Sequence, residues 1–261
     1  MKKKIFILFL SQIIYLSGYS QYSTLNAHSH NDYQNKIPFW TAYNAGFGSI
    51  EADIWAVNGV LMVAHQEKEI TAERTLDQLY IQPIVKLFKT NGGKAWAKNN
   101  NTLQLMIELK SSVEPTLSLL VQTLKQYPEV FDQKVNNRAV RIVITGKQPS
   151  VVAFAKYPSN IYFDGNLHQP YTSAQLKRVP LFSFNLAEFT KWKGKNDIPV
   201  NEAKRISQVI DSVHLLGSKI RFWNAPDFID AWKTFINLKV DYINTDNIAK
   251  LSEYLKVGSE N

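Results

Sequence analysis

Eight short runs of β-branched and aromatic residues recur along the chain, and helix-like stretches separate them. The runs are LNAHSH (25–30), SIEADIW (49–55), LQLMIELK (103–110), VRIVITG (140–146), IYFDGN (161–166), VPLFSFNL (179–186), KIRFWNAP (219–226) and DYINTD (241–246). Between them, stretches 114–128 and 201–217 repeat apolar residues at helical spacing. Strands that alternate with helices form βαβ units and a parallel sheet. Eight such units predict an α/β fold, a single (β/α)8 TIM barrel.

An open, doubly wound sheet is the alternative for a chain with this alternation. Such a sheet usually carries a glycine-rich phosphate-binding turn after its first strand. No such turn follows NAHSH, and the chain has neither an internal repeat nor a low-complexity linker. Residues 21–261 are therefore expected to form one domain.

The start of the chain differs in character from the rest. Three lysines at positions 2–4 precede the apolar segment IFILFLSQIIYL, which small residues follow. This order is typical of a secretory signal peptide, and the apolar segment is shorter than the ~20 residues that span a bilayer. We expect residues 1–20 to be a signal peptide and the protein to be exported, either to the periplasm or out of the cell. An uncleaved membrane anchor is the alternative.

Composition excludes several classes of protein. The absence of cysteine excludes structural disulfides, cysteine zinc sites and thiol nucleophiles. Without the lysines at positions 2–4, the net charge would fall from +8 to +5, and no dense Lys/Arg tract is present. We therefore expect no nucleic-acid partner. With 45% hydrophobic residues, the chain can bury a core large enough to stabilise it without disulfides.

Charged side chains in the strand-like runs are the most informative residues, because the active sites of (β/α)8 barrels lie at the C-terminal ends of the strands. Those singled out as candidate site residues are, in chain order, His28, His30, Glu51, Asp53, Glu108, Lys110, Asp164, Arg221 and Asp246. The period of two in a strand places Glu51 with Asp53, and His28 with His30, on one face.

Acidic residues on neighbouring strands predict a metal site. Buried carboxylates that lie close together raise one another's pKa unless a cation neutralises them. Glu51, Asp53 and Glu108 are therefore candidate ligands of one hard divalent cation, Mg²⁺ or Ca²⁺. A salt bridge between Glu108 and Lys110 is the structural alternative.

A further histidine follows the second run by way of a turn. The segment VNGVLMVAHQ passes through Asn58-Gly59 into a second apolar run that ends at His65. A hairpin at this turn would return His65 to the end of the barrel that carries Glu51 and Asp53.

These motifs, in this order, resemble a known superfamily. A histidine, Glu-x-Asp, NG-x-L-x-V-x-H and Glu-x-Lys follow one another as in glycerophosphodiester phosphodiesterases and phosphatidylinositol-specific phospholipases C. The chain is most similar to the bacterial and fungal branch that begins with HSHNDY, over 27–246 and most specifically over 28–110. The resemblance implies a metal-dependent phosphoric diester hydrolase in which two histidines act as general acid and base.

The resemblance also implies roles for individual residues. His28 and His65 take the places of the two catalytic histidines, Glu51, Asp53 and Glu108 those of the metal ligands, and Lys110 that of a lysine near the phosphate. Typical glycerophosphodiesterases have arginine where this chain has Ser29. SHND is closer to the phospholipase branch, which would make His30 catalytic and Asn31 a further metal ligand. Both registers stay open, and Ala27 before His28 favours His28.

Further expectations concern the substrate and its surroundings. Asp164, Arg221 and Trp223 are expected to bind substrate together with Lys110, because they lie at strand ends. The expected partner is a small-molecule or lipid-derived phosphodiester, and a lipid-derived one would bring transient contact with a membrane surface. We expect a monomer.

Two other functions compete with this one. In an amidohydrolase-type metal hydrolase, His28 and His30 would need further histidines on later strands, and only His168 and His214 remain. In a non-enzymatic barrel that binds glycans or lipid headgroups, Trp55 and Trp223 would line the pocket, whereas Trp232 is expected in the core.

Overall fold

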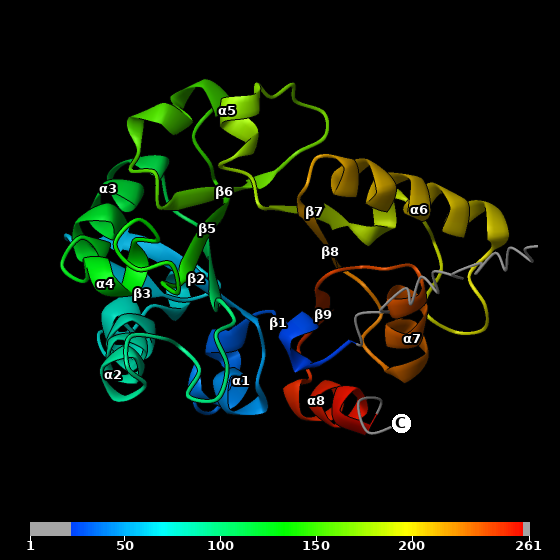
Figure 1. Cartoon of the computed structure of the whole chain (residues 1–261), viewed down its shortest axis with the longest axis horizontal. Helices are drawn as coiled ribbons and strands as arrows, with labels where there is room; N and C mark the ends of the chain where they lie inside the picture. Colours follow the sequence, from blue (N-terminus) through cyan, green and yellow to red (C-terminus); the bar gives the residue numbers. More distant parts are fainter. Residues whose placement is uncertain (1–21, 258–261) are drawn as a thin grey trace, which may run out of the picture.

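The computed structural model describes residues 22–257, with a parallel sheet at the centre and helices around it (Figure 1). Eight strands follow one another around the sheet in the order β8-β7-β6-β5-β4-β2-β1-β9. They are β1 (Ala27–Ser29), β2 (Ser49–Val57), β4 (Gln104–Leu109), β5 (Arg141–Gly146), β6 (Ile161–Gly165), β7 (Leu181–Asn185), β8 (Lys219–Trp223) and β9 (Ile243–Thr245). Each coincides with one predicted run. A parallel bridge between Arg221 and Tyr242 joins the two ends of the sheet. The predicted (β/α)8 barrel is confirmed and is nearly closed.

Helices of unequal length connect these strands. They are α1 (Trp40–Ala45), α2 (Gln82–Thr90), α3 (Val113–Leu124), α4 (Pro128–Phe131), α5 (Ser173–Leu176), α6 (Val200–Leu215), α7 (Ile229–Asn237) and α8 (Ile248–Val257). The two stretches predicted to be helical form α3 with α4, and α6. Between β5 and β6, a 3-10 helix over Val151–Lys156 takes the place of an α-helix.

Apolar spacing explains how the helices cover the barrel. In α6, Ile206, Ile210 and Val213 are buried at intervals of three and four residues, so one face of the helix packs inward. The main core lies between the helices and the outer face of the sheet. A separate small cluster of Met106, Leu181 and Tyr242 comes from three different strands or strand ends.

A hairpin extends β2 beyond the barrel. Strand β3 (Val60–Val63) pairs antiparallel with the second half of β2, and Asn58 and Gly59 at the turn have φ of 48° and 78°. Positive φ at both central residues is the geometry of a type I′ hairpin turn. The chain then returns to the barrel, where Ala64 donates a backbone hydrogen bond to the Asp53 carbonyl over 3.3 Å. The hairpin predicted from Asn58-Gly59 is confirmed.

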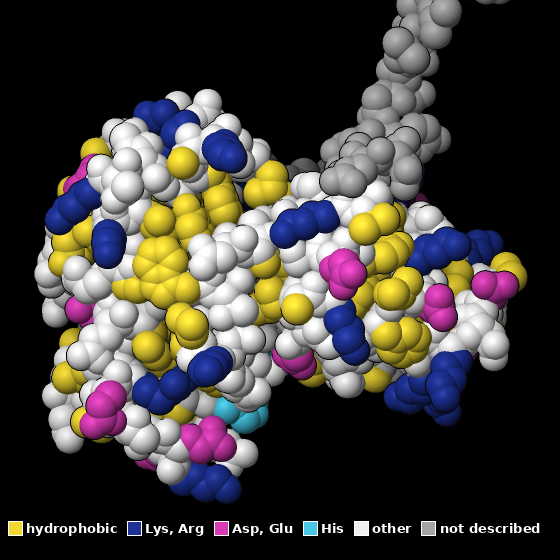
Figure 2. Space-filling model, turned by 90° about the horizontal axis from the view of Figure 1, so that it is seen from below, with side chains coloured by type: hydrophobic (Ala, Val, Ile, Leu, Met, Phe, Trp, Pro, Cys, Tyr) yellow, Lys and Arg dark blue, Asp and Glu magenta, His cyan; other side chains and the backbone are white. Residues whose placement is uncertain are grey.

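The surface carries charges of both signs. On the face shown in Figure 2, Lys and Arg side chains stand in small groups separated by hydrophobic, uncharged and acidic ones.

Within residues 22–257, no helix combines the length and the apolar character needed to cross a membrane. The predicted signal peptide, residues 1–20, lies outside the described residues.

Candidate active site

A cavity of about 810 Å³ opens at the C-terminal ends of the parallel strands. Its lining includes nine of the candidate site residues singled out from the sequence: His30, Glu51, His65, Glu108, Lys110, Asp164, Arg221, Trp223 and Asp246. This cavity therefore lies where the site was predicted, at the strand ends of the barrel.

The three predicted acidic ligands converge. Glu51 and Asp53 project from β2, and the strand register pairs Asp53 with Glu108 on β4. One carboxylate oxygen from each of Glu51, Asp53 and Glu108 lies within 4.8 Å of the other two. This group could hold a metal ion.

Asp53 is the residue whose surroundings fit a cation best. Its carboxylate is buried, and Oδ1 has no hydrogen-bond partner among the described residues. Burial and the nearby charges of Glu51 and Glu108 raise the pKa of Asp53 to about 6. A buried carboxylate oxygen without a partner, facing two further acids, has the surroundings that a bound cation would stabilise.

Lys110 supplies positive charge to the same group. Its Nζ lies 3.0 Å from Asp53 Oδ2 and 2.9 Å from Glu108 Oε1. The salt bridge considered from the sequence is therefore present. It engages one oxygen of each acid and leaves Asp53 Oδ1 unpaired.

Gly146, the last residue of β5, makes room for Glu108. Its φ is +72°, a region that side-chain-bearing residues rarely adopt. A Cβ at this position would lie 2.6 Å from Glu108 Cγ and 2.9 Å from the Leu109 carbonyl oxygen. Glycine at 146 thus allows the Glu108 side chain to lie where it does.

Glu51 is held from the other side by Arg221 of β8. Arg221 Nη1 lies 2.5 Å from Glu51 Oε2, and both side chains are almost fully buried. Burial alone would raise the pKa of Glu51, but the Arg221 charge and the His28 hydrogen bond outweigh it and lower that pKa. Glu51 is therefore ionised, and its Oε1 remains for another partner.

His28 lies beneath the cavity. Its ring is fully buried, with Nδ1 2.8 Å from Ser49 Oγ and Nε2 2.7 Å from Glu51 Oε2. Burial and the Arg221 charge lower its pKa to about 4. A neutral, enclosed imidazole with both nitrogens engaged cannot reach a ligand in the cavity. The preference for His28 over His30 does not agree with this placement.

His30 lines the cavity. It follows β1 directly, and its Nδ1 lies 2.8 Å from Asp246 Oδ1 at the end of β9. Burial lowers the pKa of His30, but the hydrogen bond to Asp246 and the charge of Glu51 outweigh it, so the pKa is raised. A carboxylate on Nδ1 fixes the proton there and turns Nε2 toward other partners.

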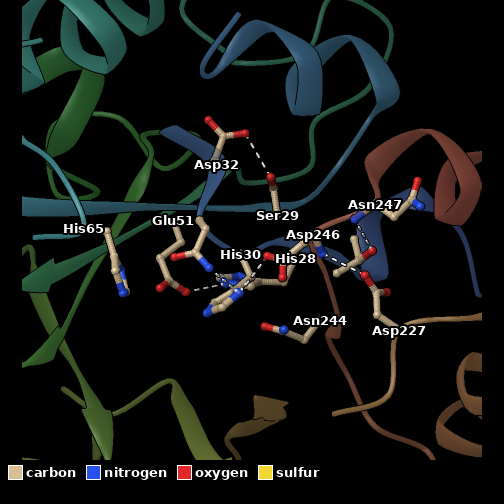
Figure 3. A network of polar contacts seen from close by, with 12 residues as sticks. His28, Ser29, His30, Asp32, Glu51, His65, Asp227, Asn244, Asp246 and Asn247 are labelled. Atoms are coloured by element: carbon tan, nitrogen blue, oxygen red, sulfur yellow. Dashed lines mark hydrogen bonds and ion pairs between the residues drawn. The ribbon is translucent and has the colours of Figure 1, made fainter. Parts of the chain in front are cut away.

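His65 stands on the other side of Glu51 from His30 (Figure 3). The side chain is 44% exposed, and Nδ1 lies 3.3 Å from Asp53 Oδ2. His30 and His65 thus flank the acidic group, and each has its Nδ1 next to a carboxylate. The carboxylate is that of Asp246 for His30 and that of Asp53 for His65.

The loop after β1 brings further polar groups to the site. Asn31 has φ 47°, and its Oδ1 accepts a 2.7 Å hydrogen bond from the Tyr33 hydroxyl. Asn31 was predicted as a metal ligand, and the hydroxyl that its oxygen contacts also lies 2.7 Å from Asp53 Oδ2 of the acidic group. The buried Asp32 holds the loop by accepting hydrogen bonds from Ser29 Oγ, the Phe39 backbone N–H and Tyr80 (Figure 3 shows the first).

The predicted substrate-binding residues line the far part of the cavity. Asp164 accepts a 3.0 Å hydrogen bond from Thr145 Oγ1, and its Oδ1 has no partner among the described residues. Burial raises the pKa of Asp164 to about 6, although Arg221 lowers it. Trp223 is 40% exposed at the rim.

The geometry of the site gives less support to the two competing functions, an amidohydrolase-type metal hydrolase and a non-enzymatic binding barrel. The metal-capable group found among residues 22–257 contains three acids and no histidine. His168 lines the cavity from the segment after β6, whereas His214 lies on α6 and pairs with Asp241. Trp55 turns its Nε1 to the Ala64 carbonyl instead of lining the cavity.

Sequence reasoning missed Tyr33 and Ser49, one of the partners of His28. Tyr33 stands inside the quoted motif HSHNDY, but an aromatic residue beside apolar runs is usually assigned to the core. Ser49 was missed because nothing local distinguishes it. Asp246 was noted as a charge at a strand end, and its position after the last strand could have suggested a contact with the first strand of a closed barrel.

Comparison with known proteins agrees with the resemblance seen in the motifs. Residues 19–164 match the family described as AIM6-like phosphodiesterase domain, and residues 219–249 match the glycerophosphoryl diester phosphodiesterase family. The first match covers more than half of the chain. The protein belongs to the AIM6-like phosphodiesterase domain family, within the glycerophosphodiester phosphodiesterase-like superfamily.

Individual relatives extend this finding. Altered inheritance of mitochondria protein 6 homolog from Arthroderma benhamiae is 27% identical over 260 residues, covering 87% of this chain and 82% of that protein. Altered inheritance of mitochondria protein 6 from Saccharomyces cerevisiae (strain YJM789) is 27% identical over 275 residues, covering 87% and 70%. The crystal structure of a glycerophosphodiester phosphodiesterase from Parabacteroides distasonis superposes with a TM-score of 0.52 at 16% identity, over 90% of this chain and 95% of that one. This last similarity concerns the fold.

The predicted export, to the periplasm or out of the cell, is wrong. The relatives just described are named for the inheritance of mitochondria and not for a secreted or periplasmic role. The prediction rested on the first 20 residues alone, and they lie outside the described part of the chain.

Proposed function

We propose that the protein is a metal-dependent phosphodiester hydrolase in which His30 and His65 act as general acid and base. One observation carries the proposal: two cavity-lining histidines, each with Nδ1 next to a carboxylate, flank a group of three acids. Figure 3 shows both histidines with Glu51, one of the three acids, between them. An imidazole that donates through Nδ1 has Nε2 free to exchange a proton with a ligand.

The proposal assigns the strand-one role to His30 instead of His28. His28 is enclosed between Ser49 and Glu51, whereas His30 lines the cavity. General acid–base catalysis requires hydrogen-bond contact with the reacting group, directly or through one water. His28 instead contributes to the surroundings of Glu51.

Glu51, Asp53 and Glu108 would hold the cation, and Asp53 Oδ1 is buried without a hydrogen-bond partner among the described residues. Carboxylate oxygens suit the hard cations Mg²⁺ and Ca²⁺. When bound, the cation would neutralise charge on the phosphate oxygens.

The chain's own residues supply the remaining chemistry. Displacement at phosphorus needs a base near the entering oxygen and an acid near the leaving one, and His30 and His65 lie on different sides of Glu51. In hydrolysis, one removes a proton from the attacking water as its oxygen bonds to phosphorus, and the other gives a proton to the departing alcohol as its P–O bond breaks. Lys110 and Arg221 provide positive charge for the anionic substrate, and Asp164 and Trp223 contact its alcohol portion.

Hydrolysis of bis(p-nitrophenyl) phosphate tests this function. The full chain should release nitrophenolate in the presence of Mg²⁺ or Ca²⁺ and should lose that activity in EDTA. A glycan- or headgroup-binding barrel would show no activity in either condition, and this outcome would contradict the proposal. Phosphorus NMR of glycerophosphodiesters, phosphoinositides and lysophospholipids would then separate hydrolysis from a cyclising transfer.

A further inference from the structure

The Tyr33 hydroxyl lies among three polar groups of the site. It is 2.7 Å from Asn31 Oδ1, 2.7 Å from Asp53 Oδ2 and 3.1 Å from His65 Nδ1. The side chain is 3% exposed and does not contribute to the cavity lining. Its backbone carbonyl accepts a hydrogen bond from the Arg74 guanidinium, so both ends of the residue are held.

The hydrogen-bond donors and acceptors around this hydroxyl determine the tautomer of His65. A phenol has one hydrogen to donate, and a carboxylate oxygen can only accept. Both oxygens near His65 Nδ1, the Tyr33 hydroxyl at 3.1 Å and Asp53 Oδ2 at 3.3 Å, are therefore acceptors for it once the phenol hydrogen points to Asp53 or Asn31. The proton of a neutral His65 belongs on Nδ1, and Nε2 keeps its lone pair.

His65 depends on these contacts more than His28 depends on its own. Its side chain is 44% exposed, and the contacts of its ring nitrogens with described residues are those of Nδ1 with Tyr33 and Asp53. An exposed imidazole with so few restraints changes rotamer and tautomer easily. The closer of the two oxygens belongs to Tyr33.

The same hydroxyl does not connect His65 to His30. Asn31 Nδ2 lies 3.0 Å from His30 Nδ1, but that nitrogen carries the proton that Asp246 Oδ1 accepts over 2.8 Å, and two donors form no hydrogen bond. The polar contacts of the Tyr33 hydroxyl therefore join Asn31, Asp53 and His65.

We propose that Tyr33 is a positioning residue for His65 of the acid–base pair. Its hydroxyl holds the His65 ring with the proton on Nδ1. The proposal rests on the proposed function, because it assigns Tyr33 to the reaction that His30 and His65 perform. Tyr33 itself touches no substrate.

Tyr33→Phe tests the proposal, because it removes the hydroxyl and keeps the buried ring. In full-length protein with Mg²⁺, kcat should fall by about tenfold or more while KM changes by less than about threefold. Tyr43→Phe is the matched control, because it removes a tyrosine hydroxyl outside the cavity, one that donates to the Ala95 carbonyl over 2.8 Å and accepts from Asn91 Nδ2 over 3.5 Å. It should leave kcat within about twofold of the unaltered protein. Equal kcat for Tyr33→Phe and Tyr43→Phe would overturn the proposal.

Nitrogen-15 NMR of the imidazoles at pH 8 gives a readout that does not need activity. His65 should carry its proton on Nδ1 in the unaltered protein and in Tyr43→Phe, and should become a mixture of tautomers in Tyr33→Phe. A His65 protonated on Nε2 in the unaltered protein would overturn the role of Tyr33, even if Tyr33→Phe failed to fold. Absence of phosphodiesterase activity together with the expected tautomer change would reject the proposed function while the positioning of His65 by Tyr33 stood.

Discussion

His28 and His30 have the same chemistry and two different environments. The alternation of a strand places both on one face, which is why the motif alone could not choose between them. Strand β1 ends at Ser29, so His30 already belongs to the turn that Asn31 makes with φ 47°. His28 within the strand is fully buried, whereas His30, just beyond its end, lines the cavity wall. Depth in a barrel depends on where the strands begin and end, and that is a tertiary property.

Alanine substitutions can separate these roles. His30→Ala and His65→Ala should each lower kcat toward bis(p-nitrophenyl) phosphate by at least ~10²-fold, the low end for general acid–base catalysis. His214→Ala removes a histidine of a similar pair, with Asp241 at 2.8 Å, on the outside of the barrel, and should keep its activity. His28→Ala should mainly lower stability, by about 1–3 kcal/mol, because Ser49 and Glu51 lose a buried partner.

The comparison requires kcat and thermal unfolding of each purified variant. Full activity in His30→Ala, combined with a folded but inactive His28→Ala, would reverse the assignment made here. Full activity in His65→Ala would leave the proposed reaction without its second proton-transfer group.

At the residue scale, the acids were easier to predict than their neighbours. A charge inside an apolar run such as LQLMIELK is conspicuous, and Glu51, Asp53 and Glu108 do converge. Tyr33 gave no comparable signal, because its ring packs like any core aromatic and only its hydroxyl takes part. Arg221 was visible as a strand charge, but its contact with Glu51 joins residues 170 positions apart in sequence.

At the scale of elements, the strands and the β2–β3 hairpin follow from local sequence. The β-branched runs and Asn58-Gly59 are short-range signals, so they predict the strands and the hairpin without tertiary information. The connection between β5 and β6, with its 3-10 helix over Val151–Lys156, does not follow from a periodic pattern. The closing contact between Arg221 and Tyr242 is likewise a consequence of how the whole sheet curves.

Two glycines with positive φ, one at the end of β5 and one in the β2–β3 turn, test how tightly that end of β5 is packed. Gly146 and Gly59 have similar φ, +72° and +78°, so alanine brings comparable backbone strain at both. A Cβ at 146 meets Glu108 Cγ at 2.6 Å, whereas a Cβ at 59 meets nothing within 4 Å. Gly146→Ala should therefore lower the free energy of unfolding by about 1–3 kcal/mol more than Gly59→Ala, as overpacking does. Urea unfolding of both variants measures the difference, and equal losses would show that Glu108 moves aside freely.

At the scale of the whole molecule, the barrel gathers charges that are far apart in the chain. Strand β2 brings two acids, β4 brings one, and β8 brings Arg221 from the opposite part of the sheet order. Close carboxylates in a buried place oppose folding unless cations balance them. Lys110 and Arg221 provide part of that balance, and Asp53, with its raised pKa of about 6, shows that the balance is incomplete.

A divalent cation should therefore stabilise the fold as a whole. A ligand that binds only the folded state, at a hundredfold excess over its Kd, adds about 2.7 kcal/mol to the free energy of unfolding. For a domain of this size that corresponds to a rise in Tm of roughly 5–10 °C. We expect this rise in Tm with millimolar Mg²⁺ or Ca²⁺, and we expect EDTA to reverse it.

Glu108→Gln should lose most of the rise because it removes one ligand charge. Glu188→Gln, which changes a cavity acid outside the group, should keep it. If neither cation moves the Tm of the unaltered protein, or if both variants respond equally, Glu51, Asp53 and Glu108 do not form a metal site.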